Sequence, residues 1–465
     1  MIDGFARTPS VLPGGLLELC VSTDAPAFRV DVYRCGEELT HVAGPAWFEG
    51  RDVPHHLPFH DWSRDNAGLS GEPLGAWPAH TLAVGPDWRS GVYVATLADA
   101  DGRGGTTAPA AAPPPDARHG RALFAVRSAT PGTGTSILYK LPLLTWHAYN
   151  QVAAEHYTPA TGTGGWCLYS DFLELPVEGP LSVCVRRPGG GTGATPFDTF
   201  NPDPFDPSPR QTFAHWDALA VAWLERSGVA VDYCTDLDLH AEGEDLLAPY
   251  GTLVSFGHDE YWSARMRTSV ERFVAAGGHA AFFGGNTCWW EVAFDDPWTF
   301  RRSRHWSDAP VPDRPENALT GVSFRHGGER PATGRPAPVG FQVQHADHWV
   351  YAGTGLRDAD LFGAGPDEHL VGYECDGAHF DRSELRRGRS VRPTGEDGTP
   401  ADFAILGVGD VGERGWGNGN RAATLGVHAP RGMVFTASTT DWPRLLARRS
   451  PVVEQITQNV LDRVS

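Results

Sequence analysis

The sequence predicts an α/β protein with an all-β domain at its N-terminus, and three observations lead to this fold class. Apolar and polar residues tend to alternate from Gly15 to Arg127, which is typical of antiparallel strands. Beyond this region, short apolar runs are followed by loops and then often by helices, which is typical of a parallel sheet. Of the 465 residues, 55 are Gly and 38 are Pro, so many turns and long loops are expected and a helix bundle is disfavoured.

The N-terminal domain, residues 1–130, is expected to be an immunoglobulin-like β-sandwich. Its strands are predicted within LLELCVSTDAPAFRVDVYRCG and GVYVATLADADG. The Gly-, Ala- and Pro-rich segment 102–120 lies between two strand-like runs, GVYVATLA and RALFAVRS, so a long hairpin loop is favoured over a domain linker. The domain boundary is placed instead at about Pro131 to Gly134.

The second domain, residues 131–465, is predicted to begin with an α/β core. Its expected strands are the apolar runs SILYKLPLL, VAVDYC, TLVSF and HAAFF. Apolar residues at helical spacing predict helices over Phe213–Ser227 and Ser263–Ala276, which Gly228 and Gly277 should end.

The C-terminal part of this domain is expected to be rich in β-strands. After Trp290, strand-like segments recur as VGFQVQH, HLVGYECDG, DFAILGVG, AATLGVH and GMVFTAS, and a helix is predicted near Pro451–Arg463. The low-complexity stretch Pro188–Arg210 is expected to be exposed to solvent.

Charge and cysteine usage exclude several classes of function. The chain has 38 Lys and Arg against 57 Asp and Glu, and its net charge of −19 would repel phosphate backbones and anionic membranes. We therefore expect neither a nucleic-acid nor a membrane partner. The seven cysteines form no CxxC pair, which argues against a cysteine zinc site and favours a reducing compartment. With no signal-like N-terminus, the protein is predicted to be cytoplasmic.

Polar motifs follow three of the predicted strands. They are TWHAYN after SILYKLPLL, GHDEYW after TLVSF, and GGNTCWW after HAAFF. Ligands of an open parallel sheet bind beyond the carboxyl ends of its strands, so these motifs should share one edge. His258 and Glu260 should point the same way and serve metal binding or acid–base chemistry, whereas Asp259 is expected to cap the helix that starts near Ser263.

Cys288 also follows a strand and a Gly-Gly turn, but it lacks the setting of a nucleophile. A nucleophile elbow needs the reactive residue at the sharp turn itself, flanked by small residues, whereas Cys288 is followed by two tryptophans. A buried, inert thiol is therefore expected, and Asn286 is the better candidate to face a ligand.

These motifs resemble those of the N,N-dimethylformamidase large (beta) subunit-like family. The likeness rests on TWHAYN, GGWCLY, VSFGHDEYWSARMRTSVE, AAGGHAAFFGGNTCWW, VGYECDG and GMVFTASTTDW, and extends from about Pro131 to the C-terminus. It implies an α/β core that resembles class I glutamine amidotransferases and an amidohydrolase with one mononuclear iron. The chain is shorter than that subunit, and the family's pocket lysine has no counterpart, because Lys140, the only lysine, precedes the motifs.

The resemblance also implies the metal ligands. Carried over by motif, they are Tyr149 in TWHAYN, Tyr169 in GGWCLY and Glu260 in GHDEYW, with Tyr157 and Tyr261 as competitors for the second phenol position. Three anionic oxygens suit a hard ion such as Fe³⁺. Because the pKa of tyrosine is about 10, only a strongly Lewis-acidic ion would hold two phenolates at neutral pH.

The catalytic residues implied by the resemblance are His258, Asn286 and Glu374. The expected reaction is attack of metal-bound water on an amide or related C–N bond, with His258 or Glu374 relaying protons to the departing amine. The substrate would be a small molecule of the amide type, and a homo-oligomer is compatible with the sequence.

Two other functions compete with this hypothesis. One is a metal-free cysteine amidohydrolase that uses Cys288 with His258. The other is a non-catalytic protein that binds a ligand or glycan and in which the α/β core is a relic. Metal analysis separates the iron hypothesis from both.

Overall fold

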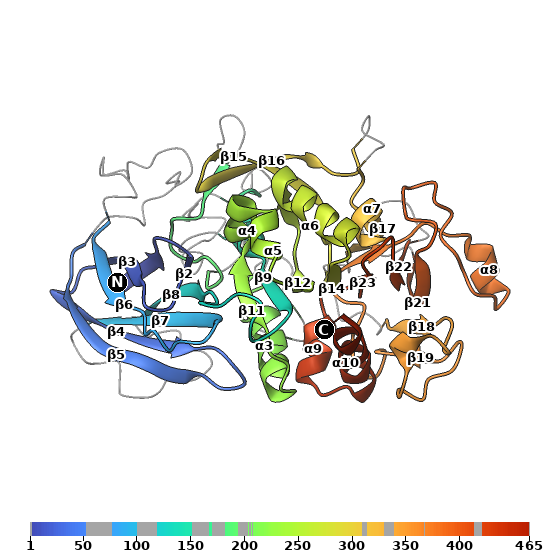
Figure 1. The fold of residues 1–465 in the computed structure, drawn as a ribbon, viewed down its shortest axis with the longest axis horizontal. Coiled ribbons are helices and arrows are strands. Elements are labelled where there is room, and N and C mark those ends of the chain that lie inside the picture. The colour runs from blue at the N-terminus through green and yellow to red at the C-terminus, as the bar shows by residue number, and fades with distance from the viewer. Residues whose placement is uncertain are drawn as a thin grey trace.

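The computed structural model describes residues 2–52, 77–99, 119–150, 167–169, 182–193, 203, 206, 208–308, 314–329, 339–366, 368–412 and 421–464. Figure 1 shows two parts side by side, an N-terminal part made of strands and a larger part in which helices flank a sheet.

The N-terminal part consists of two sheets with an apolar interior. One sheet has the order β1–β3–β6 and the other β2–β8–β7–β4–β5. Leu19, Phe28, Val30 and Tyr93 are among the side chains buried between them. β7 and β8 pair antiparallel, as a hairpin requires, while residues 102–118 of the expected hairpin loop lie outside the described residues. The strands are β1 (Ile2–Ala6), β2 (Ser10–Val11), β3 (Leu16–Thr23), β4 (Ala27–Arg34), β5 (Thr40–Glu49), β6 (Ala79–Ala83), β7 (Gly91–Asp99) and β8 (His119–Val126).

A nine-stranded mixed sheet organises the larger part. Five neighbouring strands run parallel in the order β11–β9–β12–β14–β23, and β22, β21, β18 and β19 continue the sheet with antiparallel pairing. Every residue of β12 is buried, as expected for a strand covered on both faces. The strands are β9 (Ile137–Leu141), β11 (Asp232–Thr235), β12 (Thr252–His258), β14 (His279–Gly285), β18 (Phe341–Val343), β19 (Leu361–Phe362), β21 (Ala404–Gly412), β22 (Arg421–His428) and β23 (Val434–Thr436).

Helices cover both faces of the parallel strands. Figure 1 shows α4, α5 and α6 above the sheet and α3, α9 and α10 below it. The Ser263 hydroxyl caps α6, and the helix ends at Gly277, whose φ is 110°. The helices are α1 (Leu143–Tyr149), α3 (Asp217–Arg226), α4 (Asp236–Glu242), α5 (Glu244–Leu247), α6 (Ala264–Ala276), α7 (Asn317–Thr320), η4 (Trp349–Tyr351), α8 (Arg382–Arg386), α9 (Trp442–Ala447) and α10 (Pro451–Val464).

Two small sheets lie beside the large one. Their orders are β10–β16–β15–β13 and β17–β20. Their strands are β10 (Ser182–Cys184), β13 (Tyr261–Ser263), β15 (Trp290–Asp296), β16 (Thr299–His305), β17 (Ser323–Glu329) and β20 (Glu374–Gly377).

Two expectations about the chain before α3 are wrong. The helix begins at Asp217 and not at Phe213, because the Phe213 carbonyl oxygen accepts the N–H of Ala218, five residues on, in place of the helical i to i+4 bond, and residues 211–216 form turns. The described parts of Pro188–Arg210 are not simply exposed to solvent, since Arg210 is only 1% exposed. Its guanidinium lies 4.3 Å from the centre of the Tyr373 ring, which offers an alternative to hydration.

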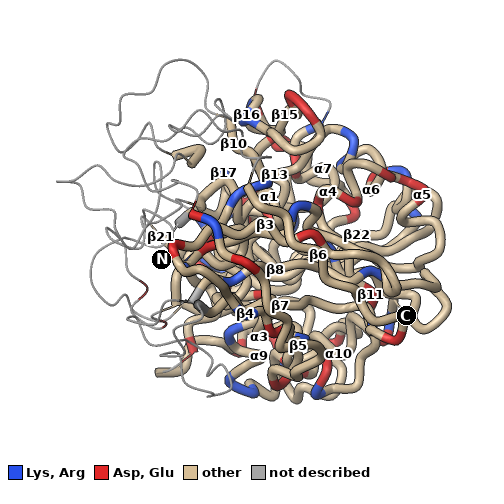
Figure 2. Tube along the Cα trace, turned by 90° about the vertical axis from the view of Figure 1, so that its left-hand side faces the viewer, with Lys and Arg blue, Asp and Glu red and all other residues tan. Residues whose placement is uncertain are grey.

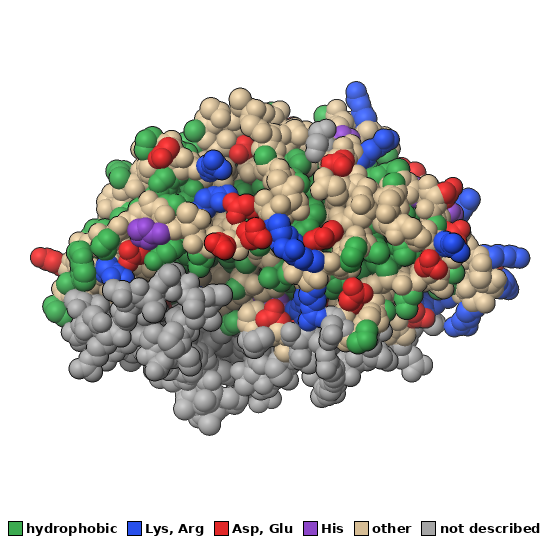
Figure 3. Space-filling view, turned by 90° about the horizontal axis from the view of Figure 1, so that it is seen from below, with side chains coloured by type: hydrophobic (Ala, Val, Ile, Leu, Met, Phe, Trp, Pro, Cys, Tyr) green, Lys and Arg blue, Asp and Glu red, His purple; other side chains and the backbone are tan. Residues whose placement is uncertain are grey.

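Acidic and basic side chains are interspersed on the surfaces drawn in colour. Figure 2, seen from the side of the N-terminal part, shows both charges mixed along the chain, and Figure 3, seen from below, shows them side by side among apolar side chains. Ion pairs such as Arg226–Glu454 contribute to this pattern. Within the described part of the chain, no helix has both the length and the apolar character needed to cross a bilayer.

Candidate active site

The expected site residues follow three strands at the carboxyl edge of the sheet. β9 leads into α1, whose last residue is Tyr149, and β12 ends at His258, two residues before Glu260. β14 ends at Gly285 and is followed by Asn286. Because His258 and Gly285 are partners in the parallel register of β12 and β14, these loops meet at one edge.

Two glycines allow the walls of the site to approach closely. Gly257 has a φ of 68°, and a Cβ atom there would lie 2.5 Å from Trp216 Cβ. A Cβ atom on Gly285 would lie 2.7 Å from the carbonyl oxygen of Glu374. A larger residue at either position would therefore displace Trp216 or the segment that carries Glu374.

The three expected donor residues meet, with Tyr149 and Glu260 buried and Tyr169 partly buried. Tyr149 Oη donates to Glu260 Oε2 over 2.8 Å, and Tyr169 Oη lies 2.8 Å from Tyr149 Oη and 3.3 Å from Glu260 Oε1. Tyr261, which competes for the second phenol position, has its Oη 2.6 Å from Tyr169 Oη, and the described hydrogen bonds do not join it to Glu260. Tyr157, the other competitor, lies outside the described residues.

The expected catalytic residues adjoin these oxygens. His258 Nε2 lies 2.6 Å from Glu374 Oε2 and 3.3 Å from Glu260 Oε2. Asn286 Nδ2 donates to Glu374 Oε2 over 3.1 Å and lies 3.3 Å from His258 Nε2. Asn286 has a φ of 51°, which asparagine tolerates better than most residues. The structure thus brings all the expected site residues together.

Burial dominates the acid–base properties of the site. It raises the pKa of Glu260 to about 7, although His258 acts in the opposite direction. Burial and then Glu260 raise the pKa values of Tyr149 and Tyr169 well above their ordinary value. Burial disfavours the charged form of His258, but Glu374 and Glu260 outweigh it and raise the pKa. The oxygens therefore hold protons that a strongly charged cation could displace.

The donor set fits a small, hard cation. Separations of 2.8 to 3.3 Å among the oxygens of Tyr149, Tyr169 and Glu260 are typical of neighbouring ligands placed about 2 Å from one ion. Phenolate and carboxylate oxygens suit ferric iron better than softer metals. Among the described residues, this site included, no three His, Cys, Asp or Glu side chains are arranged to hold a metal, so the fit depends on the two tyrosine oxygens beside Glu260.

The expectation that Asp259 caps a helix is wrong. Ser263 is the N-cap of α6, and Asp259 Oδ1 instead accepts hydrogen bonds from Lys140 Nζ at 2.6 Å and Trp262 Nε1 at 3.0 Å. Lys140 is fully buried and also donates to Asp236 Oδ1 over 2.6 Å. The sequence signal for these contacts was a lysine inside the apolar run SILYKLPLL, because a buried ammonium group requires carboxylate partners.

Gln211 is a site residue that sequence reasoning missed. Its Oε1 lies 2.5 Å from His258 Nδ1, on the opposite side of the ring from the carboxylates. An imidazolium that carries a proton on each nitrogen satisfies Gln211 on one side and Glu374 on the other. No motif marks Gln211, because its contact depends on a turn with a φ of 56° that only tertiary structure explains.

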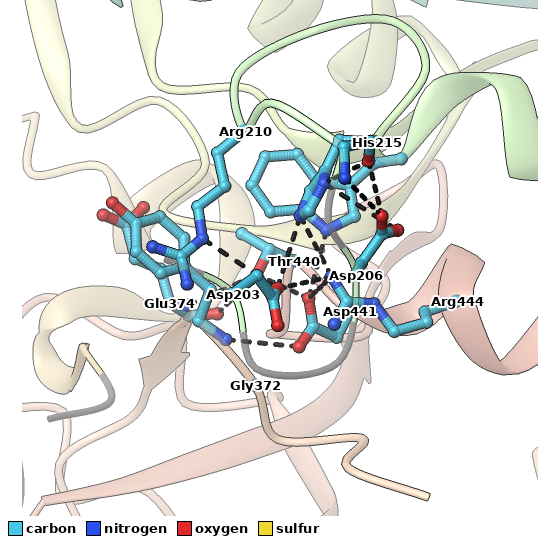
Figure 4. A network of polar contacts seen from close by, with 12 residues as sticks. Asp203, Asp206, Arg210, His215, Gly372, Glu374, Thr440, Asp441 and Arg444 are labelled. Atoms are coloured by element: carbon cyan, nitrogen blue, oxygen red, sulfur yellow. Dashed lines mark hydrogen bonds and ion pairs between the residues drawn. The ribbon is translucent and has the colours of Figure 1, made fainter. Parts of the chain in front are cut away.

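A second buried polar network supports Glu374 from behind (Figure 4). Asp441 accepts hydrogen bonds from Trp216 Nε1 at 3.0 Å and from the backbone N–H of Tyr373 at 3.3 Å. Arg444 Nη2 lies 3.6 Å from Asp441 Oδ1. The network therefore holds both the segment that carries Glu374 and the indole wall beside His258. Its other labelled members are Asp203, Asp206, Arg210, His215, Gly372 and Thr440.

Cys288 is not placed as a nucleophile. Its side chain is fully buried, and burial raises the pKa of the thiol well above its ordinary value. The charged groups that act most on the thiol are Arg267 and Glu316, and no contact with His258 occurs among the described residues. The Cys–His pair that a cysteine amidohydrolase requires is therefore absent from the described site.

The fold and the site define an α/β protein that gathers two tyrosines and a glutamate at the carboxyl edge of its parallel strands. The chain belongs to the N,N-dimethylformamidase beta subunit-like family, whose C-terminal region model matches residues 58–457.

Named relatives share part of the sequence. N,N-dimethylformamidase beta subunits from Paracoccus aminophilus and from an Alcaligenes species are 27% and 30% identical to this chain over 206 residues. These matches cover 39% of this chain and only 27% of each relative. Among solved structures, a ThuA-like protein from Bacteroides uniformis is matched over 54% of this chain and 82% of its own, with 12% identity and a TM-score of 0.29.

Proposed function

We propose that this protein is an iron-dependent hydrolase of an amide or a related C–N bond. The observation that carries the proposal is the group of oxygens from Tyr149, Tyr169 and Glu260, which lie 2.8 to 3.3 Å apart. Membership of the N,N-dimethylformamidase beta subunit-like family supports amide hydrolysis. Five parallel strands with helices on both faces support the further proposal that the core is related to class I glutamine amidotransferases.

Tyr149, Tyr169 and Glu260 would hold the ion. When bound, iron supplies a Lewis acid that polarises a substrate carbonyl and makes water nucleophilic near neutral pH. Tyr149 and Glu260 are buried and Tyr169 is partly buried, which lowers the local dielectric, so that charge developing on the substrate is stabilised more strongly than in water.

His258 and Glu374 would handle the proton. Their contact of 2.6 Å favours the charged form of the imidazole, because the carboxylate raises the pKa of His258. His258 can then give the Nε2 proton to the departing amine nitrogen, while Gln211 holds Nδ1. The amide of Asn286 donates to Glu374 and keeps this carboxylate oriented towards the imidazole.

The test combines metal analysis with an activity assay. The purified full chain is expected to contain about one iron per molecule, to absorb visible light as ferric phenolates do, and to release amine from a panel of small formamides and acetamides. Chelation should remove the colour and the activity together, and ferric iron should restore both. A colourless, iron-free preparation that hydrolyses these amides would overturn the proposal.

A further inference from the structure

We propose that Lys140 is a positioning residue that sets the distance between Tyr149 and Glu260. The inference rests on the proposed function only in naming iron as the ion that these two residues help to hold. Lys140 is the only lysine in the chain, and neither the proton transfer nor the donor set uses it.

Lys140 lies in a closed ionic cluster beneath the donors. Its Nζ is 2.6 Å from Asp236 Oδ1 and 2.6 Å from Asp259 Oδ1, and all three side chains are 0% exposed. The ammonium group also lies 4.6 Å from the centre of the Trp262 ring. One cation therefore joins two carboxylates that would otherwise repel each other in the interior.

Each carboxylate continues into one of the two donor-bearing segments. Asp236 Oδ2 accepts the backbone N–H of Leu144 over 2.9 Å, in the first turn of the helix that ends at Tyr149. Asp259 immediately precedes Glu260 in the chain. Lys140 consequently links the start of α1 to the loop after β12.

A second contact runs beside this link. The backbone N–H of Glu260 donates to Thr145 Oγ1 over 3.0 Å, so α1 and the loop also touch directly. The length of that hydrogen bond depends on the position of the loop. Lys140 fixes this position through Asp259, the residue directly before Glu260. Metal donors must lie within about 0.2 Å of their required distance, so a small shift of this loop affects ion binding.

Stability alone does not account for the cluster. A buried group of charges is often no more stabilising than apolar residues of the same volume, because desolvation offsets the attraction. Its advantage is fixed geometry, which is what the two donors need. The residues that orient metal ligands typically change metal affinity 10- to 100-fold when they are replaced.

The test uses a variant that removes the charges and keeps the shape, Lys140→Met/Asp236→Asn/Asp259→Asn. Its affinity for ferric iron, supplied as the citrate, is expected to fall 10- to 100-fold while the unfolding midpoint in urea stays near that of the unchanged protein. Asp232→Asn is the control, because it neutralises a buried carboxylate at the other end of β11, bonded to Tyr250. A folded triple variant that binds iron within twofold of the unchanged protein would overturn the inference.

A second readout does not depend on iron. Hydrogen exchange of the Glu260 amide in iron-free protein should be at least tenfold faster in the triple variant and unchanged in Asp232→Asn. If the unchanged protein takes up no iron, the proposed function fails, and this exchange rate alone decides whether Lys140 positions the loop. If the triple variant does not fold, Asp259→Asn is measured in the same way, and an unchanged exchange rate there refutes the positioning role.

Discussion

Tyr149 Oη donates to Glu260 Oε2 over 2.8 Å, although 111 positions separate the two residues. The contact joins the end of α1 to the loop after β12 inside the protein. Burial and the neighbouring charge disfavour ionising both groups at once, so this pair keeps a proton near neutral pH. A cation bound there would displace that proton, so ion binding should be coupled to pH.

Glu260→Ala should remove bound iron and activity together and leave the fold intact. Burial disfavours the charged form of this carboxyl group and raises its pKa to about 7. Its removal from the iron-free protein should therefore leave the fold intact. Iron content by mass spectrometry and the unfolding midpoint in urea check the two halves of this expectation. Glu291→Ala is the control, because Glu291 pairs with Arg304 outside the site. Iron at one per chain in Glu260→Ala would exclude Glu260 as a ligand.

Tyr149→Phe and Tyr169→Phe should each weaken iron binding and alter the visible absorption. Each change keeps the stacked rings, whose centroids are 4.4 Å apart, and deletes one oxygen, so the free energy of unfolding should change by only about 1 kcal/mol. Tyr261→Phe is the matched comparison, since its oxygen contacts Tyr169 and not Glu260. A larger loss of iron in Tyr261→Phe than in Tyr169→Phe would assign the second phenolate to Tyr261.

Much of the site could be predicted, because an apolar run followed by a polar motif indicates where a strand ends. β12 and β14 are short apolar runs that end at the second residue of GHDEYW and of GGNTCWW. A parallel register therefore places the two motifs at the same edge of the sheet. Glu374 could not be derived in this way. It lies on β20 in a separate two-stranded sheet, and only the likeness of GYECDG pointed to it.

The errors arose where distant residues override a local preference. Asp259 precedes a helix and suits a cap, but Lys140, 119 positions away, takes its carboxylate. Phe213 continues a helical pattern, yet its N–H bonds to Gly191 and its carbonyl oxygen accepts the N–H of Ala218, five residues on, so the chain turns here and the helix begins at Asp217. Gln211 reaches His258 through the same turns, so neither its role nor the start of α3 could be read from neighbouring residues.

Cys288→Ala should retain substantial activity and normal iron content. The thiol is buried and held in its protonated form, so it cannot act as a nucleophile, and losing the sulfur should cost about 1 kcal/mol of stability. Steady-state amine release at saturating substrate measures this, with Cys234→Ala as a second buried thiol for comparison. Complete loss of activity with iron retained would favour the cysteine amidohydrolase instead.

Asp376→Asn should make stability depend less on pH. Burial raises the pKa of Asp376 to about 8, although the backbone N–H of Thr287 donates to its Oδ2 over 3.2 Å. The unfolded carboxyl loses its proton near pH 4, so between about pH 4 and pH 8 the folded state binds more protons than the unfolded state. Stability from this group is therefore present at low pH and is lost as the pH rises through 8.

Between pH 6 and pH 9 this loss should amount to about 3 kcal/mol in the unchanged protein, and the asparagine variant should lack it, because a neutral amide has no proton to release. Urea unfolding of the iron-free full chain at both pH values measures the difference. Asp462→Asn, which neutralises an exposed carboxylate on α10, should keep the full pH dependence of the unchanged protein. Equal slopes for Asp376→Asn and Asp462→Asn would mean that Asp376 is ionised in the folded protein. Its buried negative charge would then need a partner near Thr287, where a cation or a bound water donating to Oδ1 could satisfy it.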